Sequence, residues 1–124
     1  MPRFAILEHT GAPDDPAGRH FDLLIEAAES CRTWRLATLP EPGGPPVKAV
    51  ELPLHRLDWL DHEVGEVSGG RGFARNVARG ECRRLTDDSS AWTGSEAIIV
   101  SAPHSGHVFR LMPTEDGWLA VAGD

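Results

Sequence analysis

Three side chains in the first quarter of the sequence have the types and spacing to bind a divalent metal ion. His20 and Asp22 lie two residues apart in a segment that alternates apolar and polar residues as a strand does. Side chains two apart on a strand project from one face, with Cα atoms roughly 7 Å apart. His9 ends the preceding predicted strand and supplies a third ligand if the two strands pair. Two imidazoles and a carboxylate form a facial ligand set for manganese, iron or zinc.

Several polar residues allow more than one interpretation. The same spacing fits a solvent-facing His20 and a loop-capping His9. His55 directly follows a predicted strand, where it could donate a proton, bind a phosphate oxygen or pack at the surface. No role follows from the sequence for His62. Five closely spaced arginines could grip phosphates or form a solvent-exposed face; they are Arg71, Arg75, Arg79, Arg83 and Arg84.

Short strands joined by tight turns are expected to position these residues. The 10 prolines and 13 glycines suit such a chain better than a helix bundle. Strands are predicted at 4–9, 20–26, 32–36, 47–52, 73–78, 81–85, 96–102, 107–112 and 118–122. A short helix is predicted at 54–60, and loops at 40–46 and 64–72. The fold class predicted for 1–124 is mainly β: a small single-domain β-barrel of about eight or nine short strands with one short helix.

Composition excludes some functions. A net charge of −7 argues against broad, non-specific nucleic-acid binding, because phosphate repels an acidic surface. Cys31 and Cys82 are too few and too far apart for a disulfide scaffold or a CxxC pair, and we expect two free thiols on strands. The sequence contains neither a membrane-length apolar run nor a signal peptide. A cytoplasmic location and no membrane partner are therefore expected.

Several short motifs occur in an order that is typical of one family. They are Arg-Phe-Ala-Ile-Leu-Glu-His at 3–9, His-Phe-Asp-Leu-Leu-Ile-Glu at 20–26, Thr-Trp-Arg-Leu at 33–36, His-Arg-Leu-Asp-Trp-Leu-Asp at 55–61 and Gly-Trp-Leu-Ala-Val at 117–121. Together with the glycine-rich loop after residue 61, they resemble the 3′-phosphoesterase domain of bacterial DNA ligase D. The resemblance covers nearly the whole chain.

This resemblance implies a specific activity. Such domains are compact β-barrels that use manganese to trim the 3′ end of a DNA strand during end joining, removing a terminal ribonucleoside and then a 3′-phosphate. It implies manganese, or zinc, as the cofactor, DNA or RNA 3′ ends as substrates, and a separate ligase or polymerase as a partner in DNA repair. By position, the metal ligands are His9, His20 and Asp22. His55 contacts the scissile phosphate, and Glu26 supports the site.

The sequence also departs from the family pattern. An active-site arginine of the family is replaced by Leu24, and a basic residue by Thr38. Candidates for the missing positive charge are Arg19, Arg35, Arg56 and Arg71, of which Arg56 and Arg71 are assigned to substrate binding. Two alternatives stay open: a divergent, non-catalytic barrel that binds metal, nucleic acid or protein, and a structural barrel with an incidental His/Asp cluster.

Overall fold

Alternation of apolar and polar residues produces an antiparallel sheet of short strands. The computed structural model describes residues 3–11, 13, 18–67, 72–84, 98–102 and 107–123. Those residues contain nine strands and one 3₁₀ turn, η1. They are β1 (Arg3–Thr10), β2 (Arg19–Ala27), β3 (Ser30–Leu36), β4 (Val47–Arg56), η1 (Leu57–Asp61), β5 (Val64–Glu66), β6 (Phe73–Arg84), β7 (Ile98–Ala102), β8 (His107–Thr114) and β9 (Gly117–Ala122).

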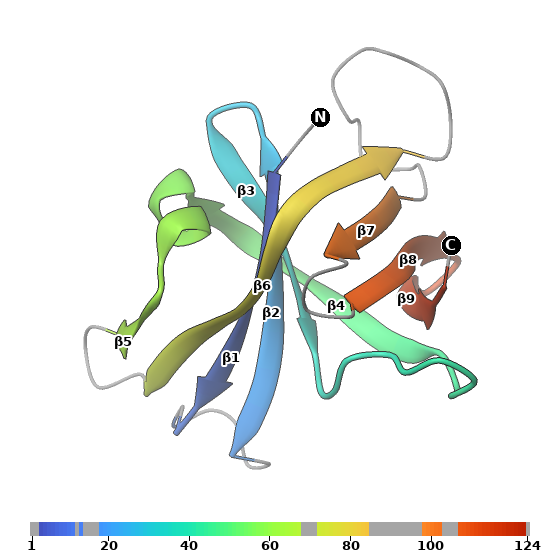
Figure 1. Cartoon of the computed structure of the whole chain (residues 1–124), viewed down its shortest axis with the longest axis horizontal. Helices are drawn as coiled ribbons and strands as arrows, with labels where there is room; N and C mark the ends of the chain where they lie inside the picture. The colour runs from blue at the N-terminus through green and yellow to red at the C-terminus, as the bar shows by residue number, and fades with distance from the viewer. Residues whose placement is uncertain are drawn as a thin grey trace.

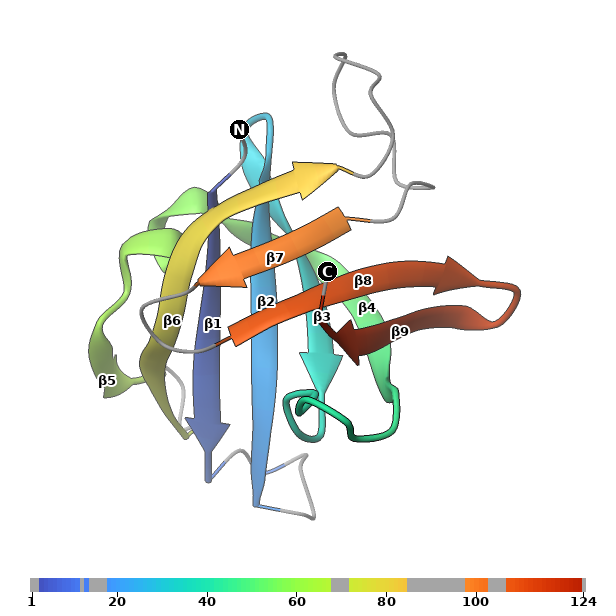
Figure 2. The same ribbon diagram turned by 45° about the vertical axis from the view of Figure 1, so that its right-hand side comes forward.

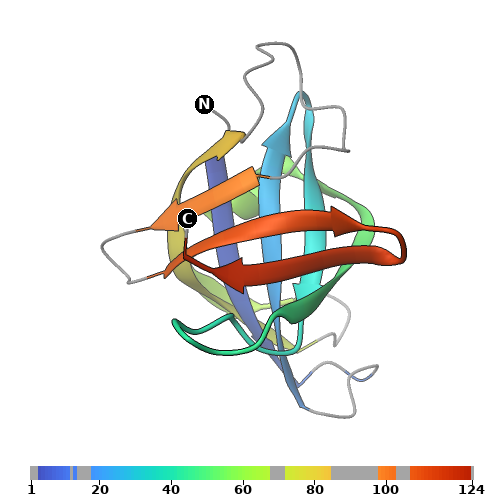
Figure 3. The same ribbon diagram turned by 90° about the vertical axis from the view of Figure 1, so that its right-hand side faces the viewer.

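All described strands belong to one curled sheet. Their order is β1-β2-β3-β4-β9-β8-β7-β6-β5, and β1 also pairs with β6. In Figures 2 and 3, strands β7, β8 and β9 cross over one face of β1, β2 and β3. The 3₁₀ turn and β5 lie on the other side (Figure 1). The mainly β prediction is confirmed.

The inner face of the curled sheet carries the main core. Phe21, Leu23 and Ile25 of β2 contribute to it, as their alternation predicts, together with Trp34 of β3 and Trp118 of β9. The rings of the two tryptophans meet edge to face, with centroids 5.2 Å apart. This geometry is favourable for aromatic pairs. The core therefore joins the first three strands to the C-terminal hairpin.

A second apolar cluster covers the outer face of β1 and β2. Its buried members are Ala5, Leu7, Leu24, Cys31, Leu60, Val67 and Ala74. Leu60 comes from η1, and Trp59 of the same turn packs against the cluster. Alternate residues of β1 and β2 face this side of the sheet. Beyond the cluster, the outward-facing residues of the two strands are the metal-ligand candidates His9, His20 and Asp22.

Two features of the middle of the chain were predicted wrongly. Pro53 was expected to end a strand, but β4 continues through it to Arg56. The register between β3 and β4 shifts between Cys31 and Thr33, so Pro53 lies opposite an irregularity, where a missing N–H is tolerated. The segment predicted to be a short helix from residue 54 is therefore strand first, and the 3₁₀ turn begins only at Leu57.

The break predicted at Arg79 and Gly80, between the strands at 73–78 and 81–85, is also wrong. Residues 73–84 form one long strand, β6, which pairs along its length with β5, β1 and β7. The expected loop at 64–72 includes strand β5. The other strands fall where they were predicted, except that residues 96 and 97 of the strand predicted at 96–102 lie outside the described residues. The C-terminal hairpin turns at Glu115 and Asp116. In the described residues, no helix has the length and apolar character needed to cross a membrane.

Candidate metal centre

His9, His20 and Asp22 lie side by side on the outer face of the β1–β2 hairpin. His9 is directly opposite His20 in the register, and Asp22 is opposite Leu7, one row further along. Opposite residues of an antiparallel pair share a face, as do residues two apart on one strand. The strand pairing therefore brings together three side chains that the sequence separates by up to 13 positions.

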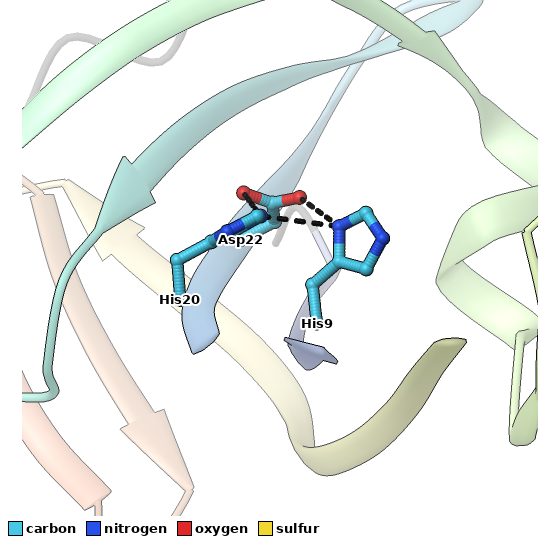
Figure 4. A group of neighbouring side chains, drawn as sticks. All are labelled: His9, His20 and Asp22. Carbon is cyan, nitrogen blue, oxygen red and sulfur yellow. Dashed lines mark hydrogen bonds and ion pairs between the residues drawn. The ribbon is translucent and has the colours of Figure 1, made fainter. Parts of the chain in front are cut away.

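The three side chains direct their donor atoms at a common point, as Figure 4 shows. Nδ1 of His9 lies 3.1 Å from Nε2 of His20 and 3.9 Å from Oδ2 of Asp22. Nε2 of His20 lies 3.6 Å from Oδ1 of Asp22. Ligands bonded to one ion at about 2.1 Å stand about 3.0 to 3.4 Å apart, for octahedral and tetrahedral angles respectively. The three donors thus fit a single divalent cation after small adjustments, and all lie within 4.8 Å of one another.

Burial makes a cation at this point favourable. His20 is 3% exposed and Asp22 is 8% exposed. A carboxylate withdrawn from water costs free energy unless positive charge or hydrogen bonds compensate it. Nε of Arg35 donates a hydrogen bond to Oδ1 of Asp22 at 3.4 Å, near the long limit for such a bond. A divalent cation between the three donors would compensate the charge of Asp22 further than Arg35 alone does.

Arg35 reaches Asp22 from the neighbouring strand. The two residues are direct cross-strand partners in the β2–β3 pair. On its other side Arg35 is opposite Val50 of β4, which is 47% exposed. Arg35 itself is 31% exposed at the side chain, against 11% for that of Asp22. Its side chain is thus partly exposed to solvent while its Nε contacts the buried carboxylate of Asp22.

Glu26 and His55 lie on the same outer face but not beside the three ligands. Glu26 is opposite Cys31, and Cys31 is opposite His55, so the three form one row across β2, β3 and β4. This row lies four positions along β2 from Asp22, which corresponds to about 13 Å. Oε1 of Glu26 accepts a hydrogen bond from the backbone N–H of Arg3 and is 3.7 Å from its Nε. The structure does not bring Glu26 and His55 together with the metal ligands.

Of the two predicted substrate-binding arginines, Arg56 belongs to the described residues. Arg56 is exposed at the end of β4 and is opposite Ser30, at the same end of the sheet as His55. Arg71 lies outside the described residues. The neighbouring Arg75 and Arg79 form ion pairs with Glu8 and Glu63, at 2.7 and 2.8 Å. This part of the arginine stretch is a solvent-exposed ionic face.

The two cysteines are buried free thiols in β3 and β6, as predicted. Burial raises the pKa of the Cys31 thiol to about 11, with a smaller upward contribution from Glu26 and an opposing one from Arg3. Burial also raises the pKa of Cys82 strongly. Both thiols therefore stay protonated at neutral pH, and neither is a nucleophile or a metal ligand in the ordinary pH range.

His62 lies at the edge of the site, although no sequence pattern singles it out. Its Nε2 donates a hydrogen bond to the carbonyl oxygen of Ala74 at 2.9 Å, and Ala74 is the cross-strand partner of His9. The ring of His62 also packs at 4.8 Å from that of Trp59. His62 therefore fixes η1 and β5 against the strand that flanks His9. Only the long-range pairing of β1 with β6 reveals this.

Neither the known family models nor the curated proteins include a match to this sequence. The resemblance to ligase D phosphoesterase domains therefore stays a prediction.

Proposed function

We propose that this chain is a metal-dependent phosphoesterase that acts on nucleic-acid 3′ ends, with manganese, or zinc, held by His9, His20 and Asp22. The observation that carries the proposal is the convergence of two imidazole nitrogens and a carboxylate at distances suited to one ion. The order of motifs that resembles ligase D phosphoesterase domains supports the choice of reaction. The curled sheet, in which β1 pairs with both β2 and β6, supports the small barrel expected for such a domain.

The chain's own residues would bind and orient the substrate. A bound divalent ion supplies Lewis acidity that polarises a phosphoryl oxygen and lowers the pKa of water. Asp22 and the two histidines would occupy one side of the ion and leave the side away from the sheet for substrate. Because His20 and Asp22 are buried, their positions are fixed before substrate arrives, and little ordering is needed on binding.

A non-catalytic metal-binding role is the second candidate. It is favoured by the separation of His55 and Glu26 from the ligands, because these two residues lie in a row about 13 Å along the sheet from Asp22. It is also favoured by Leu24, which packs in the second apolar cluster and cannot neutralise a phosphate. In this role the ion would stabilise the hairpin, or hold an anionic partner, without turnover.

Hydrolysis of a labelled DNA primer tests the choice between the two roles. Primers ending in a 3′-phosphate or in a single 3′-ribonucleotide are incubated with the protein and Mn²⁺ or Zn²⁺, and the product ends are resolved by electrophoresis. We expect 3′-hydroxyl ends with the unaltered protein and none with Asp22→Asn, which keeps the shape but weakens the ligand. Metal binding without hydrolysis of either primer would leave the non-catalytic role.

A further inference from the structure

We propose that Arg35 is the phosphate-binding residue of this site, and that it holds a terminal phosphate monoester against the metal ion. The inference rests on the proposed function and deepens it. Its basis is placement: Arg35 is the cross-strand partner of Asp22, and its Nε contacts the same carboxylate that would bind the ion. A phosphate on the ion would therefore lie within reach of this guanidinium.

Two other arginines near the site, Arg19 and Arg32, face inward. Arg19 sits over the ring of Phe21, on the inner face, and forms an ion pair with Glu8. Arg32 also faces inward, where it stacks on Trp34 and forms two hydrogen bonds with Glu51. Of the residues that share the outer face with Asp22, Arg35 brings its charge directly to the ligand set.

The chemistry of the guanidinium suits a bridging role. A guanidinium carries five N–H donors and can contact a carboxylate and a phosphate together. Arg35 is more exposed than Asp22, and the next residue in its row, Val50, is exposed. Substrate can therefore approach over β3 and β4 and meet Arg35 before the buried carboxylate.

The charge of the assembled site favours a monoester. One carboxylate, one guanidinium and a divalent ion together carry two positive charges when both histidines are neutral. A phosphate monoester carries about −1.5 to −2 at neutral pH, whereas a diester carries a single negative charge. A terminal phosphate thus neutralises the site more fully than an internal linkage does.

Titrations with two probes test the assignment. Calorimetry first measures the binding of Mn²⁺ alone to four proteins. They are the unaltered protein, the variants Arg35→Ala and Arg35→Lys, and the control Arg19→Ala. Inorganic phosphate is then titrated into each protein at saturating Mn²⁺. Arg19→Ala is a matched control because it removes one positive charge near the same hairpin, from the opposite face.

We expect Arg35→Ala to bind Mn²⁺ as tightly as the unaltered protein or more tightly. The variant lacks the guanidinium that competes with the ion for the carboxylate of Asp22. We expect the same variant to bind phosphate at least about tenfold more weakly, because it loses hydrogen bonds between charged groups. The phosphate affinity of Arg35→Lys should lie between those of the unaltered protein and Arg35→Ala, since an ammonium keeps the charge without the planar arrangement of donors. Arg19→Ala should bind phosphate like the unaltered protein.

Three results would overturn the assignment of Arg35. They differ in whether the proposed function also fails. If Arg35→Ala loses Mn²⁺ affinity and recovers full phosphate binding at saturating Mn²⁺, Arg35 only positions Asp22. If it binds phosphate normally while the unaltered protein hydrolyses the primer, the proposed function stands without this residue. If the unaltered protein binds no Mn²⁺, both proposals fail together.

Discussion

Nδ1 of His9 and Nε2 of His20 face each other at 3.1 Å across one antiparallel pair. Without an ion, a contact of this kind requires one ring to carry its proton on the facing nitrogen and the other ring to accept it. Around an ion, both facing nitrogens must be unprotonated, because a metal bonds to the imidazole lone pair. The geometry therefore makes a change of tautomer a direct signature of metal binding.

We predict that, with Zn²⁺ bound, which is diamagnetic, His9 is protonated at Nε2 and His20 at Nδ1, so that the ring that donates in the metal-free contact changes its tautomer. Long-range ¹H–¹⁵N correlation spectra of the histidine rings measure this, before and after addition of Zn²⁺. His55 is an internal control, because its Nδ1 donates to the carbonyl of Pro53 at 3.0 Å and should not change. Protonated nitrogens at the facing positions of the Zn²⁺-saturated protein would argue against these ligands.

A second prediction separates the ligands from the more distant residues of the same face. Mn²⁺ at about 100 times its Kd should stabilise the folded protein by about 2.7 kcal/mol, provided that only the folded state binds it. His20→Ala should lose this gain, because one ligand is missing. Glu26→Gln and His55→Ala should keep it, because their row lies about 13 Å from Asp22. Thermal unfolding with and without Mn²⁺ gives the comparison.

The control variants also test the role that family resemblance implies for Glu26 and His55. If either variant lost the Mn²⁺-dependent shift as fully as His20→Ala, these residues would contribute to the metal site from a distance. If both kept the shift but lost primer hydrolysis, they would act on substrate alone. The first result would contradict the separation of the Glu26 row from the three ligands.

A third prediction concerns Leu24, which stands where the phosphoesterase domains that the sequence resembles carry an arginine. Leu24 is 1% exposed and lies opposite Ala5, within the cluster that η1 covers with Leu60. Leu24→Arg would bury an uncompensated charge and should destabilise the protein by at least about 3 kcal/mol. Leu24→Met, which preserves volume, should cost less than about 1.5 kcal/mol.

Urea unfolding of the two Leu24 variants measures both changes. A Leu24→Arg protein that unfolds at the same urea concentration as the unaltered chain would mean that the cluster opens to solvent at this position. The expected loss, by contrast, would explain why a positive charge at this site must come from a neighbouring strand, where Arg35 is partly exposed.

The local arrangement of the site could be predicted from the sequence because it depends on short-range geometry. Alternation in the segment after His20 fixes which residues share a face with Asp22, and the neighbouring strand brings His9 opposite. The same alternation places Glu26 on that face, yet it does not say how far along the strand a residue can act. Glu26 has the same orientation as Asp22, and only its distance along β2 separates it from the site.

The long-range pairings could not be predicted in the same way. Gly80 suggested a break between two strands, but it lies opposite Phe4 within the β1–β6 pairing, whose one register shift falls further along, between Ile6 and Leu7. Pro53 suggests the end of a strand because proline lacks an N–H for the ladder. The register shift that accommodates it arises from the pairing of β4 with β3, which the local sequence does not show. In both cases a partner distant in sequence decides the conformation, so the local signal for a turn or a break is overridden.

The final prediction follows from the buried thiols. The pKa of Cys31 is raised by burial from 9.0 to about 11, so the folded protein keeps this proton at pH values where an unfolded thiol loses it. Above about pH 9 the unfolded state therefore binds fewer protons than the folded state, and the free energy of unfolding falls with rising pH. Cys31 alone should account for about 2 to 3 kcal/mol by pH 11, at 1.36 kcal/mol for each unit of pKa.

Cys82, whose pKa burial raises further, adds to the same decline. The chain has no tyrosine and one lysine, Lys48, so few other side chains titrate in this range. Urea unfolding at pH 8, 9, 10 and 10.5 measures the decline, with the double variant C31A/C82A as the control. We expect a falling stability for the unaltered protein and a nearly flat profile for the control. Equal slopes in the two proteins would show that the thiols ionise as readily in the fold as outside it, which would contradict their burial in β3 and β6.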